Sequence, residues 1–523
     1  DGPDGPVPGV AARYGYREAD LRVEGLAAFF AGLGLKPDNV LGVNLPNVAE
    51  AAIVILAAWR AGLVVVPLPL HWTDREIARA VEHAGIRAIV TASKVEDRPC
   101  GEHMRDIAAD NFTIRFVIGL GEEQPDGLID LALVMADLGG LGAAPDLQRR
   151  GNAADHVAAL SFSRRDGRLV AVPLTHNHLI ALGRAHADAA GVASGATLAS
   201  SMMPAGLGGL CALATALVAD ARLVCHHGRS VEGLVAGTVQ SGDGESGPLH
   251  LMIPATLARP FAEAFDAAGE SVRPALSLVA HQPGRGETPA LDGWTVTDLS
   301  SFGGLTLVPV RRVEGRRAAP WPAGDLVLAS GAVAAALRLK PRMRAGDRRP
   351  SASTGEIVLE GAIVPDAPWP EPAAGGSGRV LAVNGEGRLR TGVFGELTAD
   401  GKGLRAGGMV ADSAIVAGET IDLAALDARF ARFPGLADAA AYALDDALLG
   451  QRVGMAYVPS DGAEIDPEDV AAFLEADGLG LLERPSVVAK VAAIPRGTDG
   501  KVERSALFVK AEAPRAAKAV VAA

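Results

Sequence analysis

The sequence predicts an α/β protein with a large N-terminal domain of parallel-rich sheets flanked by helices and a small α+β C-terminal domain. At 523 residues the chain is too long for one compact core. In its first hundred residues, apolar strands alternate with helical segments, which is typical of a parallel sheet covered on both faces. After residue 401 shorter strands and helices follow one another, which indicates a smaller α+β unit.

The elements of the large domain follow from hydrophobic period and from turn and cap residues. Thr73 and Glu76, for example, can form a capping box because the hydroxyl and the carboxylate each satisfy a free amide of the first turn. Helices are expected at 18–33, 48–61, 73–84 and 177–190, strands at 40–45, 63–68, 88–91, 157–162, 275–280 and 355–361, a strand feeding a helix at 249–268, and further segments at 197–203, 210–219 and 222–226.

Two stretches, 99–151 and 314–350, show no clean period, and the proline-rich stretch 365–378 is expected to be a surface loop. The domain boundary is expected near 407–412, close to the point where shorter strands and helices begin to follow one another. In the small domain, strands are expected at 414–416, 437–444, 452–458 and 487–492, and helices at 423–433 and 467–477.

Four segments are therefore expected along the chain. Residues 1–15 form a flexible leader, 16–408 the large domain and 409–510 the small domain. Residues 511–523, rich in Ala and Lys without a pattern, form a disordered tail.

The net charge of −13 argues against a nucleic-acid partner, because sequence-independent binding needs a basic field. The longest apolar runs are interrupted or too short for a membrane span, and the start of the chain has no signal-peptide core, although it also lacks Met. Three scattered cysteines fit a reducing, cytoplasmic setting. No metal site is expected, because His226, His227 and His281 lack partners at ligand spacing.

The most specific stretch lies between residues 41 and 91. It contains Leu45-Pro46-Asn47, the run Ala57 to Leu68 and Thr73 to Glu76, in this order and spacing. The chain thereby resembles the adenylate-forming, AMP-binding family of acyl-CoA synthetases and ligases, over residues 16–507. The resemblance implies the adenylate-forming ligase fold with a mobile C-terminal domain. It also implies that a carboxylate reacts with ATP to give an acyl-adenylate, which CoA then attacks.

In this family a loop of small residues with a lysine holds the phosphates of ATP. The matching stretch here is 162–176, where Ser163, Gly167 and Thr175 fit the pattern. Val170 stands in place of the lysine, and Arg164 to Asp166 replace small residues. Backbone amides can surround a phosphate only where no bulky side chains fill the loop, and Arg164 to Asp166 are larger than the residues they replace.

Two further family motifs are changed. In Phe302 to Thr306, Gly303 matches, but Thr306 stands where the family has the glutamate that holds magnesium. In Arg390 to Phe394, Gly392 matches, but Val393 replaces the aspartate that accepts hydrogen bonds from the ribose.

The C-terminal motifs match those of the family more closely than the three motifs of the large domain do. The hinge aspartate is present as Asp412, while Met409 replaces the hinge arginine. Pro495 to Arg504 matches the terminal motif of the family and puts Lys501 in the position of the adenylation lysine.

Two functions remain open on the sequence. The four changed positions favour a binding or assembly subunit with a degraded ATP and magnesium site, weak or inactive in adenylation. The retained Lys501 leaves the alternative of an active ATP-dependent acyl-CoA synthetase, and only then are ATP, Mg and CoA expected as cofactors. A carboxylate or acyl-CoA ligand is expected in the interdomain cleft. The pocket for the acid is expected in the second half of the large domain, around 200–209 and 280–304. A protein partner or a homo-oligomer is the other expected interaction.

Overall fold

The structure of the protein is a computed structural model. The large unit and the small unit are two compact parts of the chain, described separately below. The large unit comprises Asp1–Leu70, Ile77–Ser163 and Val170–Gly408, and the small unit His71–Glu76, Arg164–Leu169 and Met409–Ala523. The expected tail 511–523, and the expected leader apart from Tyr14 and Gly15, lie outside the described residues. The structure describes residues 14–137, 142–147, 151–165, 168–227, 230–242, 247–270, 272–280, 290–313, 318–341, 351–366, 369, 388–409, 412–460, 463–496, 502–504 and 507.

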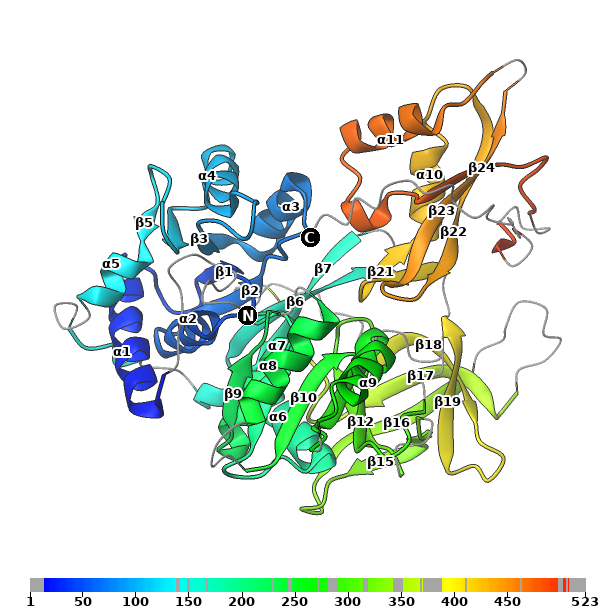
Figure 1. The fold of residues 1–523 in the computed structure, drawn as a ribbon. Helices are drawn as coiled ribbons and strands as arrows, with labels where there is room; N and C mark the ends of the chain where they lie inside the picture. The colour runs from blue at the N-terminus through cyan, green and yellow to red at the C-terminus, as the bar shows by residue number, and fades with distance from the viewer. Residues whose placement is uncertain are drawn as a thin grey trace. The chain divides into compact units, whose positions relative to one another are not determined.

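The first sheet of the large unit has seven strands in the order β5-β4-β3-β1-β2-β6-β7 (Figure 1). Strand β1 pairs in parallel with both β2 and β3, and all five of its residues are buried. Burial on both faces explains the unbroken apolar runs of the sequence. The strands are β1 Val40–Asn44, β2 Val64–Pro67, β3 Ile86–Ala92, β4 Phe116–Leu120, β5 Ile129–Asp130, β6 Val157–Arg165 and β7 Arg168–Thr175, and the helices α1 Tyr16–Gly32, α2 Ala49–Arg60, α3 Asp74–Ala84, α4 Cys100–Asp110 and α5 Leu131–Ala136.

The second sheet has six strands in the order β13-β12-β11-β10-β8-β9, parallel except for the edge strand β13. Phe261, Phe265 and Trp294 form an aromatic cluster in its core, with ring centroids 5.6 to 6.1 Å apart. The strands are β8 Thr197–Ser200, β9 Arg222–Cys225, β10 Leu249–Pro254, β11 Ala275–Ala280, β12 Val296–Ser301 and β13 Leu307–Arg311, and the helices α6 His176–Ala190, α7 Leu207–Ala219, α8 Val231–Gly242 and α9 Ala258–Ala267.

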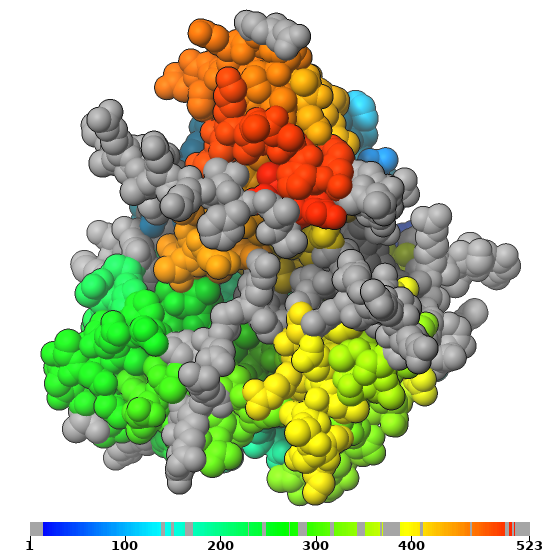
Figure 2. Space-filling view, turned by 90° about the vertical axis from the view of Figure 1, so that its right-hand side faces the viewer, coloured from blue at the N-terminus to red at the C-terminus, as the bar shows by residue number. Residues whose placement is uncertain are grey.

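The third sheet has six strands in the order β14-β19-β18-β17-β16-β15, and its described pairings are antiparallel. Its residues, yellow-green to yellow, lie together in Figure 2. Of the strands in this sheet, the sequence predicts only β17. Strand β16, for example, is not predicted, because Ala334 to Leu337 are buried consecutively and show no period of two. The strands are β14 Trp321–Pro322, β15 Gly324–Val327, β16 Val333–Pro341, β17 Thr354–Glu360, β18 Leu389–Leu397 and β19 Gly403–Met409.

The small unit has a five-stranded sheet in the order β21-β20-β23-β22, with β24 also paired to β23. Asp422 caps the first helix, since its Oδ1 accepts from the amides of Ala424 and Ala425 at 2.9 and 3.1 Å. Its elements are β20 Ser413–Val416, β21 Glu419–Asp422, α10 Leu423–Phe430, β22 Leu436–Asp446, β23 Gly450–Pro459, α11 Pro467–Ala476 and β24 Val487–Lys490.

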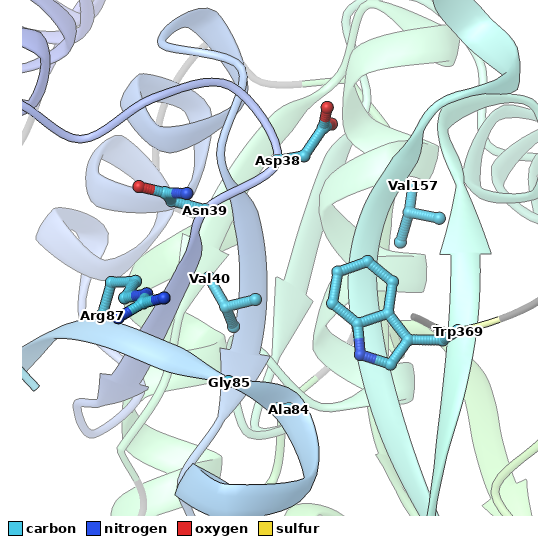
Figure 3. Close-up of a pocket in the computed structure, with 8 residues that line it drawn as sticks. All are labelled: Asp38, Asn39, Val40, Ala84, Gly85, Arg87, Val157 and Trp369. Carbon is cyan, nitrogen blue, oxygen red and sulfur yellow. The ribbon is translucent and has the colours of Figure 1, made fainter. Parts of the chain in front are cut away.

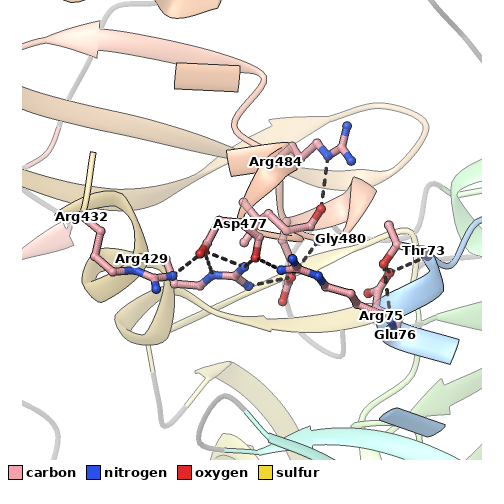
Figure 4. Close-up of polar contacts among 10 residues, drawn as sticks. Thr73, Arg75, Glu76, Arg429, Arg432, Asp477, Gly480 and Arg484 are labelled. Carbon is pink, nitrogen blue, oxygen red and sulfur yellow. Dashed lines mark hydrogen bonds and ion pairs between the residues drawn. The ribbon is translucent and has the colours of Figure 1, made fainter. Parts of the chain in front are cut away.

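Ion pairs tie the helices of the small unit together (Figure 4). Arg429 Nε lies 3.0 Å from Asp477 Oδ2, and Arg432 pairs with the same carboxylate. The figure also shows the expected capping box, in which Glu76 Oε2 accepts from the Thr73 amide at 2.9 Å. Asp477 is thus the shared anion for two arginines near the end of α10.

The structure corrects several expected boundaries. The irregular stretch 99–151 contains α4, β4, β5 and α5, and the segment expected at 197–203 is a strand only to Ser200. The helix expected at 423–433 ends at Phe430. Pro434 disfavours helical backbone at Phe433, the last residue of the expected helix.

Candidate functional site

The stretch matched to the phosphate loop is built mainly from two neighbouring strands. Strand β6 runs through Ser163 to Arg165, and β7 extends from Arg168 to Thr175, so most of the stretch matched to a loop is strand. Residues 172–175 of β7 are buried one after another, as in a strand covered on both faces. The side chains of Ser163 and Val170 are not among those described, and Gly167 lies outside the described residues.

Thr175 ends β7 and caps α6. Its Oγ1 accepts from the His178 amide at 3.2 Å, and the Thr175 amide donates to His178 Nδ1 at 3.1 Å. His178 Nε2 lies 3.2 Å from Asp366 Oδ1, and burial lowers the pKa of His178. With Nδ1 accepting, the neutral ring carries its proton on Nε2 and can donate to Asp366. The Thr175 side chain is therefore engaged in starting a helix.

The turn from Phe302 to Thr306 contains two glycines with positive φ, Gly303 at 64° and Gly304 at 72°. The Phe302 amide donates to Thr306 O at 3.1 Å, which closes the turn. Thr306 is 1% exposed, and its Oγ1 donates to the carbonyl of Ile363 at 2.6 Å. The hydroxyl at the magnesium position is thus used by the backbone of a neighbouring segment.

The structure brings this turn to the end of β6. Ser161 Oγ donates to the carbonyl of Gly304 at 3.0 Å. A Cβ at Gly304 would lie 3.1 Å from Phe162 O, so the two backbones approach closely. The first two altered motifs therefore adjoin each other in space.

The ribose motif lies in β18, and Val393 in it is 1% exposed. The Val393 amide donates to Thr391 Oγ1 at 3.1 Å, and Thr391 Oγ1 donates to Ile357 O at 2.7 Å. Gly392 has φ 73°, and its amide donates to Glu356 Oε1 at 3.1 Å. A buried isopropyl group therefore occupies the position of the ribose acceptor.

Glu356 is a residue whose role the sequence analysis missed. It is 2% exposed, and its Oε2 accepts from Arg390 Nε and Nη2 at 3.1 and 2.6 Å. The hydrogen bonds that Arg390 and the Gly392 amide donate to Glu356 hold this part of β18 against β17. The glutamate after Gly355 is part of the strand motif in the sequence, but nothing there identifies its partners.

The hinge residues lie at the start of the small unit. Asp412 Oδ2 lies 3.2 Å from Arg504 Nε, and the Asp412 carbonyl accepts from the Leu423 amide at 3.1 Å. Arg504 also donates from Nη2 to Asp427 Oδ2 at 2.8 Å and from Nη1 to Ala441 O at 2.6 Å. The side chain of Met409, the last residue of β19, is not among those described.

Lys501 lies outside the described residues, but both sides of its loop are described. Arg496 and Val502 form an antiparallel bridge, and the Glu503 amide donates to Pro495 O at 2.9 Å. Arg496 Nη2 lies 2.7 Å from Asp438 Oδ1. The base of the lysine loop is thus anchored to the sheet of the small unit.

Part of the region expected to line an acid pocket surrounds a small cavity. Ser200, Met202, Pro204 and Gly209 face a space of about 10 Å³. This volume holds about one water molecule, so this cavity itself is too small for a carboxylic acid. Residues 281–289 of the second expected segment lie outside the described residues.

Another cavity, of about 260 Å³, lies at the amino ends of the strands in the first sheet (Figure 3). Val40 and Val157, the first residues of β1 and β6, line it, and the indole of Trp369 lies beside Val157. Ligands of open α/β sheets bind at the carboxyl ends of the strands. This cavity is therefore on the wrong edge to be the nucleotide site.

Across the described part of the chain, no group of three or more His, Cys, Asp or Glu side chains is arranged to hold a metal ion. In the same residues, no helix combines the length and the apolar character needed to cross a membrane.

Comparisons with known proteins give one consistent result. The model of the family described as AMP-binding enzyme matches residues 4–240. A 2-hydroxy-7-methoxy-5-methyl-1-naphthoate–CoA ligase of Streptomyces carzinostaticus is 24% identical, over 96% of this chain and 89% of that protein.

Solved structures show the same fold. The amide bond synthetase McbA from Marinactinospora thermotolerans matches with a TM-score of 0.72 and 19% identity, over 96% of this chain and 97% of that one. The o-succinylbenzoate CoA synthetase MenE from Bacillus subtilis, a double mutant with a product analogue, matches with a TM-score of 0.71 and 17% identity, over 95% and 94% of the two chains. Residues 4–240 are thus similar to the AMP-binding enzyme family, and the chain shares the fold of these two solved structures.

Proposed function

We propose that this protein is an acyl-CoA synthetase-like family member with a degraded ATP and magnesium site, weak or inactive in adenylation, and that it acts as a binding or assembly subunit. The observation that carries the proposal is the environment of Thr306. Its hydroxyl donates to Ile363 O at 2.6 Å, and the residue is 1% exposed. A neutral hydroxyl already in use is a poor substitute for a carboxylate ligand of Mg²⁺.

Val393 supports the same conclusion. Its side chain is apolar and buried, so a ribose placed against it would leave its hydroxyl groups without an acceptor. At Val170 and Met409 the sequence likewise lacks the cations of the family. Each charge-assisted contact contributes about 1.5–3 kcal/mol, and the loss of even two of them weakens binding by about 100-fold or more.

Calorimetric titration of the full chain with Mg-ATP tests the proposal. We expect no heat of binding at near-millimolar ATP. The matched control is a quadruple variant, Val170→Lys, Thr306→Glu, Val393→Asp and Met409→Arg, which restores the groups of the family and should bind ATP more tightly if it folds. Micromolar binding by the unmodified chain would overturn the proposal.

The alternative is an active ATP-dependent acyl-CoA synthetase. The anchored base of the Lys501 loop and the retained Asp412 favour it. Pyrophosphate release across a panel of aliphatic and aromatic carboxylates, with ATP, Mg and CoA present, measures this activity. Turnover by the unmodified chain that Lys501→Ala abolishes would establish the alternative.

The binding role requires an interaction that does not depend on adenylation. We propose a carboxylate or acyl-CoA ligand and a protein partner or a homo-oligomer, in the cytoplasm. Native mass spectrometry of the protein purified from its own cells measures this. A stable complex supports the proposal, and a strict monomer without partner or ligand contradicts it.

A further inference from the structure

A further cavity of the large unit lies apart from the altered nucleotide motifs. It has a volume of about 450 Å³, and residues of α2, α7, β9 and α8 line it, together with Tyr14 and Tyr16. Its apolar wall includes Ile53, Leu213 and Val224. A volume of this size suits a small organic ligand that buries most of its surface.

One carboxylate lies in the wall of this cavity. Glu50 is 4% exposed, and its Oε1 accepts from the hydroxyl of Tyr14 at 2.7 Å. Within the described ranges, this hydroxyl is the one side-chain donor to Glu50, and no cation pairs with it. Glu50 lies in the first turn of α2, where the positive end of the helix dipole favours a carboxylate.

The other buried polar groups of the cavity are neutral. Ser241 Oγ donates to Gly237 O at 2.7 Å, so in its 3.2 Å contact with His226 Nε2 the histidine is the donor. Burial lowers the pKa of His226 to about 4, which keeps this ring uncharged near neutral pH. Neither group therefore compensates Glu50.

Arg222 is the cation on the rim of the cavity, and it is exposed. Its Nη2 donates to the carbonyl of Ser241, so part of the guanidinium is already used. Solvent screens an exposed charge far more than a buried one. The dominant unpaired charge inside the cavity is therefore negative.

We propose that this cavity is a binding site for a small organic ammonium compound, whose apolar body lies against α2 and α7 and whose cationic head pairs with Glu50. A buried carboxylate is stable only when it is paired or hydrogen bonded, and an ammonium group supplies both charge and donors. The proposal is independent of ATP, because the cavity contains none of the altered nucleotide-site residues.

Calorimetric titration with 2-phenylethylamine near neutral pH, without ATP, tests the site in the full chain. We expect saturable binding, weakened at least tenfold in Glu50→Gln, because this change keeps the shape and removes the charge. Glu263→Gln, an exposed carboxylate on α9 outside the cavity, is the matched control and should bind as the unmodified chain does.

Two uncharged or anionic probes of similar shape complete the test. We expect 2-phenylethanol to bind at least tenfold more weakly than the amine, and 3-phenylpropanoate not to bind. Equal or tighter binding of either probe, or no binding of the amine, contradicts the proposal.

A second variant covers the case in which Glu50→Gln does not fold. Leu217 lines the cavity and is 45% exposed, so Leu217→Trp can fill the space with little strain on the core. We expect it to abolish amine binding while the circular dichroism spectrum is unchanged. Undiminished amine binding by this variant would place the ligand elsewhere and overturn the proposal.

Discussion

At the scale of single residues, the interior of the large unit contains polar groups held by few partners. His186 of α6 is fully buried against α7 and β11. Its Nδ1 lies 2.9 Å from Thr215 Oγ1, and its Nε2 lies 2.8 Å from Ser277 Oγ. Burial, and to a lesser extent nearby His250, lower its pKa to about 3. Such a histidine links the stability of the fold to pH.

The predicted sign follows from proton binding. Between the folded pKa of about 3 and the ordinary value of 6.5, the unfolded chain binds a proton at His186 and the folded chain does not. The free energy of unfolding therefore falls as the pH drops below about 6.5, by at most about 1.4 kcal/mol per pH unit for this group. Urea unfolding at several pH values between about 4.5 and 7 measures the slope.

His186→Gln should reduce that slope, whatever its effect on stability at neutral pH. His83→Gln is the control, because His83 is exposed on α3 and its Nδ1 lies 3.0 Å from Arg79 O. The assignment fails if the His186 variant keeps the full slope of the unmodified chain.

A second prediction concerns the ion pair of Arg312 and Asp298. Arg312 Nε and Nη2 lie 2.7 and 2.8 Å from the two carboxylate oxygens, and both side chains are almost fully buried. Arg312→Met leaves a buried carboxylate unpaired and should lower the free energy of unfolding by about 3–5 kcal/mol. Denaturant unfolding measures this loss.

The double variant Arg312→Met with Asp298→Leu should recover most of that stability, because it removes both charges. Additive losses in the double-mutant cycle would show that the pair is not coupled.

At the scale of elements, close backbone approaches decide which substitutions a helix tolerates. A Cβ at Gly209, in the first turn of α7, would lie 2.1 Å from Met203 O and 2.6 Å from Pro204 O. At Gly233 in α8 the nearest atom would be Ser230 Oγ at 3.5 Å. A close approach of the backbone therefore requires glycine at position 209, whereas position 233 has room for a side chain, although both residues lie in helices.

Gly209→Ala should destabilise the protein, since backbone atoms must move to admit the methyl group. Gly233→Ala should stabilise it by about 0.5–1 kcal/mol, the usual gain of alanine over glycine in a helix. Thermal unfolding of the two variants side by side measures the difference. Equal shifts in the same direction would contradict the close approach at Gly209.

At the scale of the whole molecule, the small unit has a hydrophobic core of its own. Phe430 of α10 is fully buried in it, together with Met455 of β23 and Leu474 of α11. A unit with its own core can fold alone. The described contacts of Asp412, Arg504 and Asp427 also lie within this unit.

A fragment of residues 409–523 should therefore give a dispersed amide spectrum and cooperative unfolding. Phe430→Ala in the fragment should cost about 3–5 kcal/mol, enough to unfold a domain of this size. A fragment that is unfolded under native conditions would show that the small unit depends on the rest of the chain.

The sequence by itself determined the resemblance to the family, the alternating elements of the first sheet and the order of the altered motifs. Regular periods are visible without tertiary structure, as in the apolar run of β2 and the capping box of Thr73 and Glu76. The missing carboxylate at position 306 can likewise be read from the spacing of the motif alone.

Only the tertiary structure decided what these residues do in place of the expected ones. The Thr306 hydroxyl bonds to Ile363, 57 residues away, and Glu356 bonds to Arg390, 34 residues away. Glu50 likewise lines a cavity with His226, which follows β9. Such pairings depend on how distant segments pack, and local propensity and period carry no information about that packing.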